Sequence, residues 1–188
     1  ALGCVKKWRK LCPDFHISVN VSYVQMHREE FRSIVFKELE RSGVDADALI
    51  IELTESCKVM DTEQLSSDFE FFMSNDVQMA LDDFGTGYSS IALLRELKPS
   101  WIKIDHSFVA SITESHIDKA IIEYILELCR HADIKVCIEG VENENILDIV
   151  KEYEPELLQG YYFSKPISES EFEERYINCL LYTSPSPR

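Results

Sequence analysis

The chain has 188 residues, with 34 acidic against 19 basic side chains and a formal net charge of −15. A domain of this length hides about 70% of the surface that its unfolded chain exposes. The hydrophobic content of 45% excludes disorder over most of the sequence. The acidity argues against binding to a nucleic-acid polymer or an anionic membrane, because either needs a basic face. No apolar run approaches the roughly 20 residues of a membrane span, so we expect no direct membrane insertion by this segment.

Short runs rich in Ile and Val alternate along the chain with stretches of helical periodicity. The predicted strands are His16–Val21, Leu49–Thr54, Val77–Asp82, Trp101–Asp105, Lys135–Glu139 and Leu157–Gly160. The predicted helices are one that ends at Gly43, then Ser89–Leu97, His116–Asp133, Glu142–Tyr153 and Glu169–Ile177. This alternation is typical of a parallel sheet in an α/β fold.

Three apolar stripes are predicted to face the core. They are Phe31, Ile34, Val35 and Leu39 on the first helix, Ile117, Ile121, Ile125, Leu128 and Ala132 on the long helix, and Phe69, Phe71, Phe72 and Met73. The six cysteines form no CxxC pair, and we interpret them as reduced thiols packed as small hydrophobic residues in a cytosolic protein.

The residues at the strand ends decide between an open sheet and a barrel. Nearly every predicted strand ends in a charged or amide side chain, and these are Asn20, Glu52, Asp82 with Asp83, Lys103 with Asp105, Glu139 and Gln159. In a barrel, the carboxyl ends of all strands converge on one axis, so these groups would meet at one site. An open sheet would string them along an edge, where burying so many charges is hard to justify.

We therefore predict an α/β fold, a (β/α)8 TIM-like barrel that is incomplete at its N-terminus, with about six of its eight strands present. A whole barrel takes about 250 residues, so we expect about 60 further residues upstream. The expected domain covers residues 1–178. Residues 179–188 end in alternating Ser and Pro, and we expect a tail that is disordered or foreign to the domain.

The polar residues within each strand are in phase, because alternate residues face the same way. Ser18 and Asn20 share a face, as do Ala80 and Asp82. Carboxylates that converge at close range recruit cations, and a set of oxygen ligands suits Mg²⁺ or Mn²⁺ better than zinc or copper. Two such ions about 3.5–4 Å apart are typical of phosphoryl chemistry.

Each candidate also has a purely structural interpretation. These are a turn or cap for Asn20, an edge charge for Glu52, an N-cap for Asp82–Asp83, an ion pair for Lys103 with Asp105, and strand-to-helix turns for Glu139–Gly140 and Gln159–Gly160. The five histidines show no metal-ligand spacing and are interpreted as incidental. Polar residues recur at six successive strand ends, and this recurrence favours a functional site over the structural interpretations.

The ordered motifs resemble those of a known family. They are NVS (Asn20–Ser22), ELTES (Glu52–Ser56), DDFGTGYSS (Asp82–Ser90), KID (Lys103–Asp105), EGVE (Glu139–Glu142) and QGYYFSKP (Gln159–Pro166). This series resembles the EAL domain of bacterial cyclic di-GMP phosphodiesterases, from about residue 3 to residue 176. The resemblance implies a (β/α)8 barrel that hydrolyses cyclic di-GMP to linear pGpG with two Mg²⁺ or Mn²⁺ ions.

The resemblance also implies roles for single residues. Asn20, Glu52 and Asp82 correspond to ligands of the first metal, and Asp82, Asp83 and Glu139 to ligands of the second. Lys103 corresponds to the lysine that holds or activates the attacking water, and Glu55 to the glutamate that braces the DDFG loop. Gln159 and Gly160 line the substrate pocket, with Asp105 and Glu142 as supporting residues. The ions would lower the pKa of a bridging water, whose hydroxide attacks phosphorus in line.

The Glu-Ala-Leu tripeptide that names the family does not occur in this chain. Its Glu is a further metal ligand in the family, so we expect the 188-residue chain by itself to bind metal weakly and to hydrolyse cyclic di-GMP poorly. The alternatives are a receptor module that binds cyclic di-GMP without cleaving it and a metal-dependent hydrolase of another phosphate ester. The resemblance further implies a homodimer, an upstream sensor or GGDEF-type domain, and a place in the bacterial cytoplasm, with or without a membrane anchor elsewhere.

Overall fold

The computed structural model describes residues 2–54, 62–86 and 90–177. Its centre is one sheet of six parallel strands that lie side by side in chain order. The strands are β1 (Ile17–Val21), β2 (Leu49–Thr54), β3 (Gln78–Phe84), β4 (Trp101–Ile104), β5 (Lys135–Ile138) and β6 (Leu157–Leu158). Each predicted strand is confirmed to within two residues at either end.

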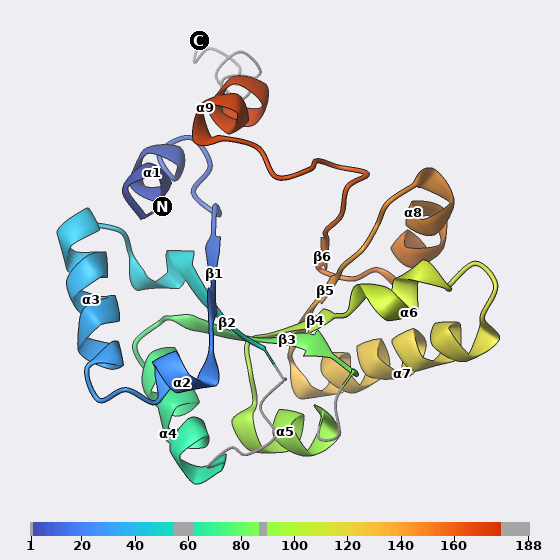
Figure 1. Ribbon diagram of the computed structural model, residues 1–188, viewed down its shortest axis with the longest axis horizontal. Helices are drawn as coiled ribbons and strands as arrows, with labels where there is room; N and C mark the ends of the chain where they lie inside the picture. Colours follow the sequence, from blue (N-terminus) through green and yellow to red (C-terminus); the bar gives the residue numbers. More distant parts are fainter. Residues whose placement is uncertain (1, 55–61, 87–89, 178–188) are drawn as a thin grey trace.

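The strand order identifies the architecture. A doubly wound sheet reverses its order at a switch point, whereas a strictly sequential parallel order is that of a barrel wall. Figure 1 shows the sheet curling round with helices on its outer side and with β1 and β6 at the two free edges. The fold is therefore an incomplete (β/α)8 barrel, as the strand ends predicted.

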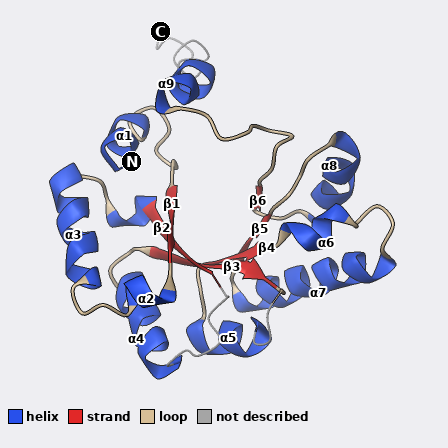
Figure 2. Cartoon of the chain, in the orientation of Figure 1, coloured by secondary structure: helices blue, strands red, loops and turns tan. Residues whose placement is uncertain are grey.

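The strands alternate with helices along the chain (Figure 2). The helices are α1 (Leu2–Trp8), α2 (Tyr23–Met26), α3 (Phe31–Ser42), α4 (Thr62–Met73), α5 (Ser90–Leu97), α6 (His106–Ala110), α7 (His116–Ala132), α8 (Glu144–Val150) and α9 (Glu169–Phe172). Shorter turns are the 3-10 helices η1 (Ala46–Ala48) and η2 (Lys151–Tyr153) and the π-helical turn η3 (Glu173–Ile177). Four of these helices, α1, α2, α4 and α6, were not predicted from the sequence.

Helix ends follow local capping chemistry. Gly43 ends α3 with φ 62°, and its N–H donates to the carbonyl oxygen of Leu39. The Ser115 hydroxyl oxygen caps the start of α7 by accepting from the N–H of Asp118. Asp133 ends α7 with φ 57°, a left-handed conformation that short polar side chains tolerate better than most. Of these helix ends, the C-terminus of α3 at Gly43 was predicted from the sequence.

The core lies between the outer face of the sheet and the helices. Alternate strand residues such as Ile51, Leu53, Met79 and Ile102 are almost fully buried there. In α4, Phe69 and Phe72 are fully buried, while Phe71 and Met73 are partly buried against the same core. The predicted aromatic stripe is therefore confirmed as core packing.

The predicted face of α7 is only partly correct, because Ile121 and Leu128 are partly buried against the core whereas Ala132 is exposed. The buried residues of this helix are Ile122, Ile125, Leu126 and Cys129, of which only Ile125 was expected. Ile117 is 73% exposed. The helix carries two adjacent apolar stripes that share Ile125, and contact with the sheet selects the second. Ile34 on α3 is likewise exposed rather than part of the core.

The two ends of the described chain lie side by side (Figure 1). The Trp8 indole N–H donates to Glu173 Oε1 over 2.8 Å, and the Trp8 and Phe172 rings are 4.9 Å apart between centroids. Lys7 forms an exposed ion pair with Glu173. These contacts join α1 to α9 and η3 above the edges of β1 and β6.

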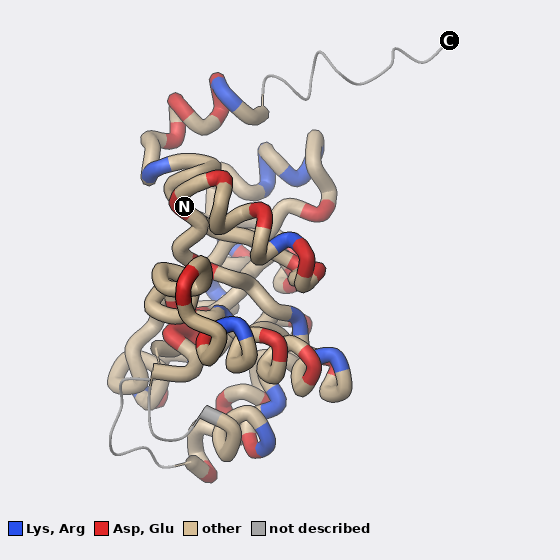
Figure 3. Tube along the Cα trace, turned by 90° about the vertical axis from the view of Figure 1, so that its right-hand side faces the viewer, with Lys and Arg blue, Asp and Glu red and all other residues tan. Residues whose placement is uncertain are grey.

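The surface carries charges of both signs, and four cysteines are free thiols. Figure 3 shows Asp and Glu interspersed with Lys and Arg along the outer helices. None of the helices within the described ranges is long and apolar enough to cross a membrane. Cys4, Cys12, Cys129 and Cys137 are free thiols, and burial raises the pKa of Cys129 and of Cys137 to about 12. Cys57 and residues 178–188, with the expected tail, lie outside the described residues.

Candidate active site

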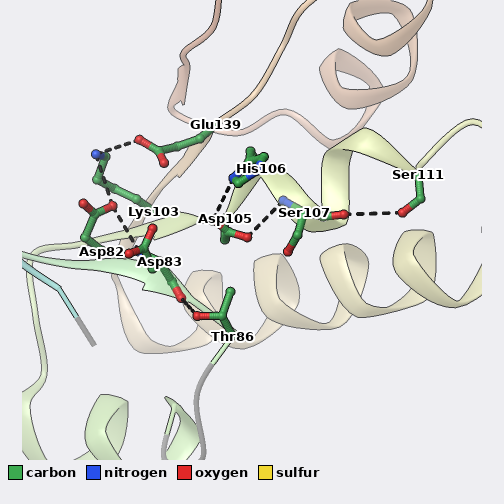
Figure 4. Close-up of polar contacts among 9 residues, drawn as sticks. All are labelled: Asp82, Asp83, Thr86, Lys103, Asp105, His106, Ser107, Ser111 and Glu139. Atoms are coloured by element: carbon green, nitrogen blue, oxygen red, sulfur yellow. Dashed lines mark hydrogen bonds and ion pairs between the residues drawn. The ribbon is translucent and has the colours of Figure 1, made fainter. Parts of the chain in front are cut away.

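Strand register brings the predicted polar residues to the inner face of the sheet. Asn20 of β1 lies beside Glu52 of β2, and Asp82 of β3 lies beside Thr54, one layer further along. Lys103 belongs to β4, and Glu139 directly follows β5. Figure 4 shows the side chains of Asp82, Lys103 and Glu139 converging from three neighbouring strands. The predicted phase of the polar residues is confirmed.

A backbone irregularity lets two successive aspartates serve one site. The pairing register of β3 and β4 shifts between Leu81 and Phe84, and Asp83 has φ 53°. Successive strand residues normally face opposite ways, but a bulge re-aims a side chain. The N–H and hydroxyl of Thr86 both donate to the carbonyl oxygen of Asp83, over 3.3 and 2.9 Å. This turn holds the strained residue in place.

Lys103 lies at the centre of the carboxylates. Its Nζ is 2.7 Å from Glu139 Oε1, 3.0 Å from Glu52 Oε2 and 3.2 Å from Asp82 Oδ1. The lysine is 7% exposed. Burial acts to lower the pKa of Lys103, but hydrogen bonds and charge from Glu139 and Glu52 outweigh it and raise the pKa above its usual range. The ammonium is therefore fixed at neutral pH.

The carboxylates outnumber this single ammonium. Burial raises the pKa of Glu139, with Lys103 opposing and the charges of Asp82 and Glu52 adding to the rise. Burial and the charge of Asp82 also raise the pKa of Asp83. Excess negative charge in a half-buried site favours the uptake of either protons or cations.

Three carboxylates have the spacing of a cation site. Asp82, Asp83 and Glu139 each offer an oxygen, and these oxygens lie within 4.8 Å of one another. Carboxylate oxygens alone suit hard divalent ions such as Mg²⁺ and Mn²⁺. The residues present therefore fit such an ion, whereas the five histidines contribute nothing to this group.

We expect cation affinity to fall as the pH drops, because protons compete for the same oxygens. The raised pKa values of Asp83 and Glu139 mean that the loss begins above the ordinary carboxyl values of 3.8 and 4.5. Mn²⁺ titration followed by electron paramagnetic resonance at several pH values measures this effect. An affinity that stays constant down to pH 4.5 would contradict it.

Gln159 and Gly160 connect the site to two cavities. Gln159 lines a cavity of about 30 Å³ inside the barrel together with Glu52 and Lys103. Both residues also line a cavity of about 690 Å³ whose walls include Tyr161 and Phe163. The predicted place of Gln159 in the same pocket as the charged residues therefore has a geometric basis.

Gly160 is required for packing. A Cβ at this position would lie 2.6 Å from the carbonyl carbon of Val141 and even closer to that residue's N and O atoms. Backbone atoms cannot move aside as a flexible side chain can. The close approach brings Gln159 against the segment that follows Glu139, and the N–H of Val141 donates to the carbonyl oxygen of Gln159 over 3.1 Å.

Gly160→Ala is expected to lower the free energy of unfolding by about 3 kcal/mol, the upper end of the usual cost of overpacking. Gly3→Ala is the matched control, because nothing lies within 4 Å of the added methyl group. We expect the control to be neutral or stabilising by up to about 1 kcal/mol, since Ala favours a helix. Urea denaturation of both variants measures the difference, and equal stabilities would contradict the assignment.

The remaining predicted residues lie at or beyond the edge of this group. Asn20 is exposed beside Glu52, and Glu142 is exposed and joins none of the contacts described above. Asp105 is buried, but its carboxylate accepts from the N–H of Ser107 and contacts His106 Nδ1 rather than Lys103. The alternative interpretation of Lys103 and Asp105 as a structural ion pair is therefore wrong. Glu55 lies outside the described residues.

Sequence reasoning missed α6. His106 was interpreted as incidental, yet its ring contacts Asp105 over 3.0 Å. Phe108 was not considered. The available signal was an Asp that directly follows a strand and precedes a Ser by two residues, which is an N-cap pattern for a short helix.

The comparison with known proteins rests on the motifs that this geometry brings together. The EAL domain family matches residues 1–166. The chain belongs to the EAL domain family. The cyclic di-GMP phosphodiesterase PdeL of Escherichia coli is 32% identical over 170 residues, which are 90% of this chain and 47% of that protein.

Solved structures agree with this assignment. The EAL domain of Mycobacterium smegmatis DcpA has a TM-score of 0.87 at 31% identity and covers 100% of this EAL chain and 82% of its own. Klebsiella pneumoniae BlrP1, solved as a manganese and cyclic di-GMP complex, has a TM-score of 0.79 at 25% identity over 88% of this chain and 42% of its own. One protein of similar fold was thus solved with both manganese and cyclic di-GMP. The chain spans between 19% and 47% of the length of the first three curated relatives.

Proposed function

We propose that this EAL domain is the catalytic part of a metal-dependent phosphodiesterase that hydrolyses cyclic di-GMP to linear pGpG. The observation that carries the proposal is the group of Asp82, Asp83 and Glu139 oxygens within 4.8 Å of one another, next to the buried ammonium of Lys103. PdeL, whose name states this activity, and the cyclic di-GMP complex of BlrP1 support the choice of substrate.

The proposal includes two Mg²⁺ or Mn²⁺ ions. Asn20, Glu52 and Asp82 would hold the first, and Asp82, Asp83 and Glu139 the second. Bound ions of this kind activate water, stabilise the charge that develops on phosphate oxygens and offset the repulsion between an acidic protein and an anionic substrate.

The chain's own residues supply position and charge. In the site without metal, the carboxylates raise the pKa of Lys103, so its ammonium supplies hydrogen-bond donors and a positive charge at neutral pH. Its three ion pairs orient one oxygen of each of its partners, Glu52, Asp82 and Glu139. Gln159 lines the cavity beside Lys103 and is placed to contact bound substrate, with Gly160 fixing its backbone.

The test is hydrolysis of cyclic di-GMP with Mg²⁺ or Mn²⁺, by the chain itself and by the longest natural reading frame that contains it. Chromatography separates cyclic di-GMP from pGpG, and equilibrium dialysis measures binding. Formation of pGpG that EDTA abolishes supports the proposal. Binding without any cleavage identifies a receptor module instead. If the protein shows no binding and no cleavage, both functions are contradicted.

The remaining parts of the proposal are a domain extent predicted from the sequence and several expectations that the family resemblance implies. They are a domain over residues 1–178, Glu55 as a brace for the DDFG loop, Asp105 and Glu142 as supporting residues, a homodimer, an upstream sensor or GGDEF-type domain, and a cytoplasmic location. Analytical ultracentrifugation tests the homodimer directly. The small share of each relative that this chain spans is compatible with further domains in such proteins.

A further inference from the structure

The short helix α6 lies between the end of β3 and the loop after β5, which together carry the cation-site carboxylates. β4 is hydrogen-bonded to β3 on one side and to β5 on the other, and α6 follows β4 after a single residue. β3 carries Asp83 near its end and leads into a turn at Gly85, and the loop after β5 carries Glu139 and Gly140. Figure 4 shows α6 beginning between Asp83 and Glu139.

One side of α6 presses on the turn that follows Asp83. Gly85 has φ +102°, and a Cβ built there would lie 2.7 Å from Phe108 Cε2 and 2.9 Å from Cζ. The Phe108 ring therefore rests directly on the Gly85 backbone, two residues after Asp83. Phe108 is partly buried and packs against the core, so the core limits how far its ring can retreat.

The other side of α6 presses on the loop of Glu139. Gly140 has φ +76°, and a Cβ there would lie 2.6 Å from His106 Cβ and 3.0 Å from His106 Cα. The imidazole of His106 is 73% exposed, so the contact is made by the first turn of α6 rather than by the ring. The N–H of Glu139 also donates to the carbonyl oxygen of Ile104 over 3.2 Å.

The helix itself is held at both ends. Asp105 caps its start by accepting from the N–H of Ser107 over 3.0 Å, and it also contacts His106 Nδ1. Val109 and Ile112 are fully buried near its end, and Ser111 donates to Asp118 of α7. A short helix fixed in this way is a rigid spacer between the loops on either side.

We propose that α6 is a positioning element, in which the Phe108 ring on Gly85 and the first turn on Gly140 set the distance between Asp83 and Glu139 in the cation site. This inference rests on the proposed function only in taking the cation to be the divalent ion of the reaction. Phe108, His106, Gly85 and Gly140 touch no reacting atom and act through the two carboxylates.

A positioning role for Phe108 predicts a change in cation affinity in addition to any change in the stability of the fold. A Phe that only fills the core lowers the free energy of unfolding when it is truncated, and it leaves the cation site unchanged in the fraction that stays folded. A spacer allows the two carboxylates to drift apart when it is shortened, so the affinity falls as well. Residues that orient metal ligands typically change metal affinity by about 10–100-fold when they are altered.

The experiment measures Mn²⁺ affinity of the 188-residue chain by electron paramagnetic resonance, at a temperature where each variant is folded by circular dichroism. Phe108→Ala is paired with Phe36→Ala, a partly buried Phe that packs on Phe71 and Phe72 of α4. Phe108→Leu is a milder variant that keeps most of the core volume. We expect Phe108→Ala to weaken Mn²⁺ binding by about tenfold, Phe108→Leu by less, and Phe36→Ala by less than twofold.

A second pair of variants replaces a glycine by alanine in each case. Gly140→Ala and Gly43→Ala both place Ala at a left-handed φ, so they share the backbone strain. The added methyl at Gly43 meets only the flexible end of Lys6, whereas that at Gly140 meets the first turn of α6. We expect only Gly140→Ala to weaken Mn²⁺ binding.

The outcomes distinguish this inference from the proposed function. If the unaltered chain binds Mn²⁺ and the α6 variants bind it as tightly as their controls, the positioning role is overturned and the cation site stands. If the unaltered chain binds no Mn²⁺ at any concentration tested, the cation site and the positioning role are overturned together. Weaker binding in the α6 variants alone supports both.

Discussion

Asp82→Asn is expected to reduce the turnover of cyclic di-GMP by more than 100-fold in the longest natural reading frame that contains this chain, while leaving the domain folded. The expected loss exceeds the roughly 10–100-fold that follows from altering a residue that only orients a metal ligand, because Asp82 is proposed to contact both ions. The change is isosteric. Asp82 Oδ1 accepts from the N–H of Asp83 over 3.0 Å and lies 3.2 Å from Lys103 Nζ, and an Asn oxygen can accept from both.

Asp82→Asn is not expected to destabilise the fold, although it removes turnover. Asp82 is one of several negative charges in a buried group, and its charge raises the pKa values of Asp83 and Glu139. Removing that charge without removing the hydrogen bonds relieves repulsion, so we expect an unchanged or slightly higher free energy of unfolding without metal. Lost turnover combined with retained stability is the signature of a residue held in place for chemistry.

Asp68→Asn is the matched control for this prediction. Asp68 is also buried, but it belongs to α4 rather than to a strand end, and it pairs with Arg32 on α3. We expect this variant to lose stability and to keep its turnover, because the Arg32 guanidinium loses its charged partner. Chromatographic assay of pGpG and thermal unfolding check both variants. An Asp82→Asn enzyme that keeps more than a tenth of the original rate would refute the assignment of Asp82.

The pattern of charged strand ends was enough to predict the barrel and most of its site. Parity places Glu52, Asp82 and Lys103 on one face, and a parallel sheet brings strand ends to one edge, so convergence follows from the sequence alone. The structure adds the distances, with Lys103 Nζ within 3.2 Å of three carboxylate oxygens. Those contacts were not predicted, because a lysine side chain can point either to a ligand or to its protein neighbours.

The features that were missed depend on contacts between distant segments. The left-handed conformation of Asp83 is imposed by the register shift against β4, which no local pattern at Asp83 announces. The buried face of α7 is selected by the sheet from two adjacent apolar stripes. α6 has only five residues, too few for a hydrophobic period to be recognised. Short and strained elements thus carry much of the site's geometry and little of its sequence signal.

Lys103→Met is expected to lower the free energy of unfolding by about 3–5 kcal/mol in the presence of EDTA, the usual cost of removing one partner from a buried ion pair. The ammonium bonds to Glu52, Asp82 and Glu139, and all of these side chains are mostly buried. Met keeps the length and the apolar part of the side chain. The expected loss therefore comes from carboxylates that repel one another without a cation between them.

Two conditions should reduce this deficit, and both follow from the excess of negative charge. Without Lys103, the pKa of Glu139 rises further above its ordinary value of 4.5, because Lys103 is the group that lowers it. A raised carboxyl pKa in the folded state favours the fold at low pH, and that contribution is lost as the pH rises through the folded-state pKa. The deficit should therefore be largest at pH 8 and smaller at pH 5. Mn²⁺ should stabilise each protein by about 2.7 kcal/mol at a concentration 100 times its own Kd, and at one shared concentration it should stabilise Lys103→Met more, because no ammonium competes for the carboxylates there.

Lys135→Met is the control, since Lys135 is exposed at the start of β5 and lies 5.1 Å from the Trp101 ring centroid. We expect a change of no more than about 1 kcal/mol there, as for an exposed cation–π contact, with no dependence on Mn²⁺. Urea denaturation at pH 5 and pH 8, with EDTA or with Mn²⁺, gives the complete comparison. If Lys103→Met is as stable as the unaltered chain in EDTA at pH 8, the carboxylates do not need a cation. Suppose that Mn²⁺ reduces the loss of unfolding free energy in Lys103→Met and leaves that of Lys135→Met unchanged. The ammonium and the divalent ion then neutralise the same buried negative charge.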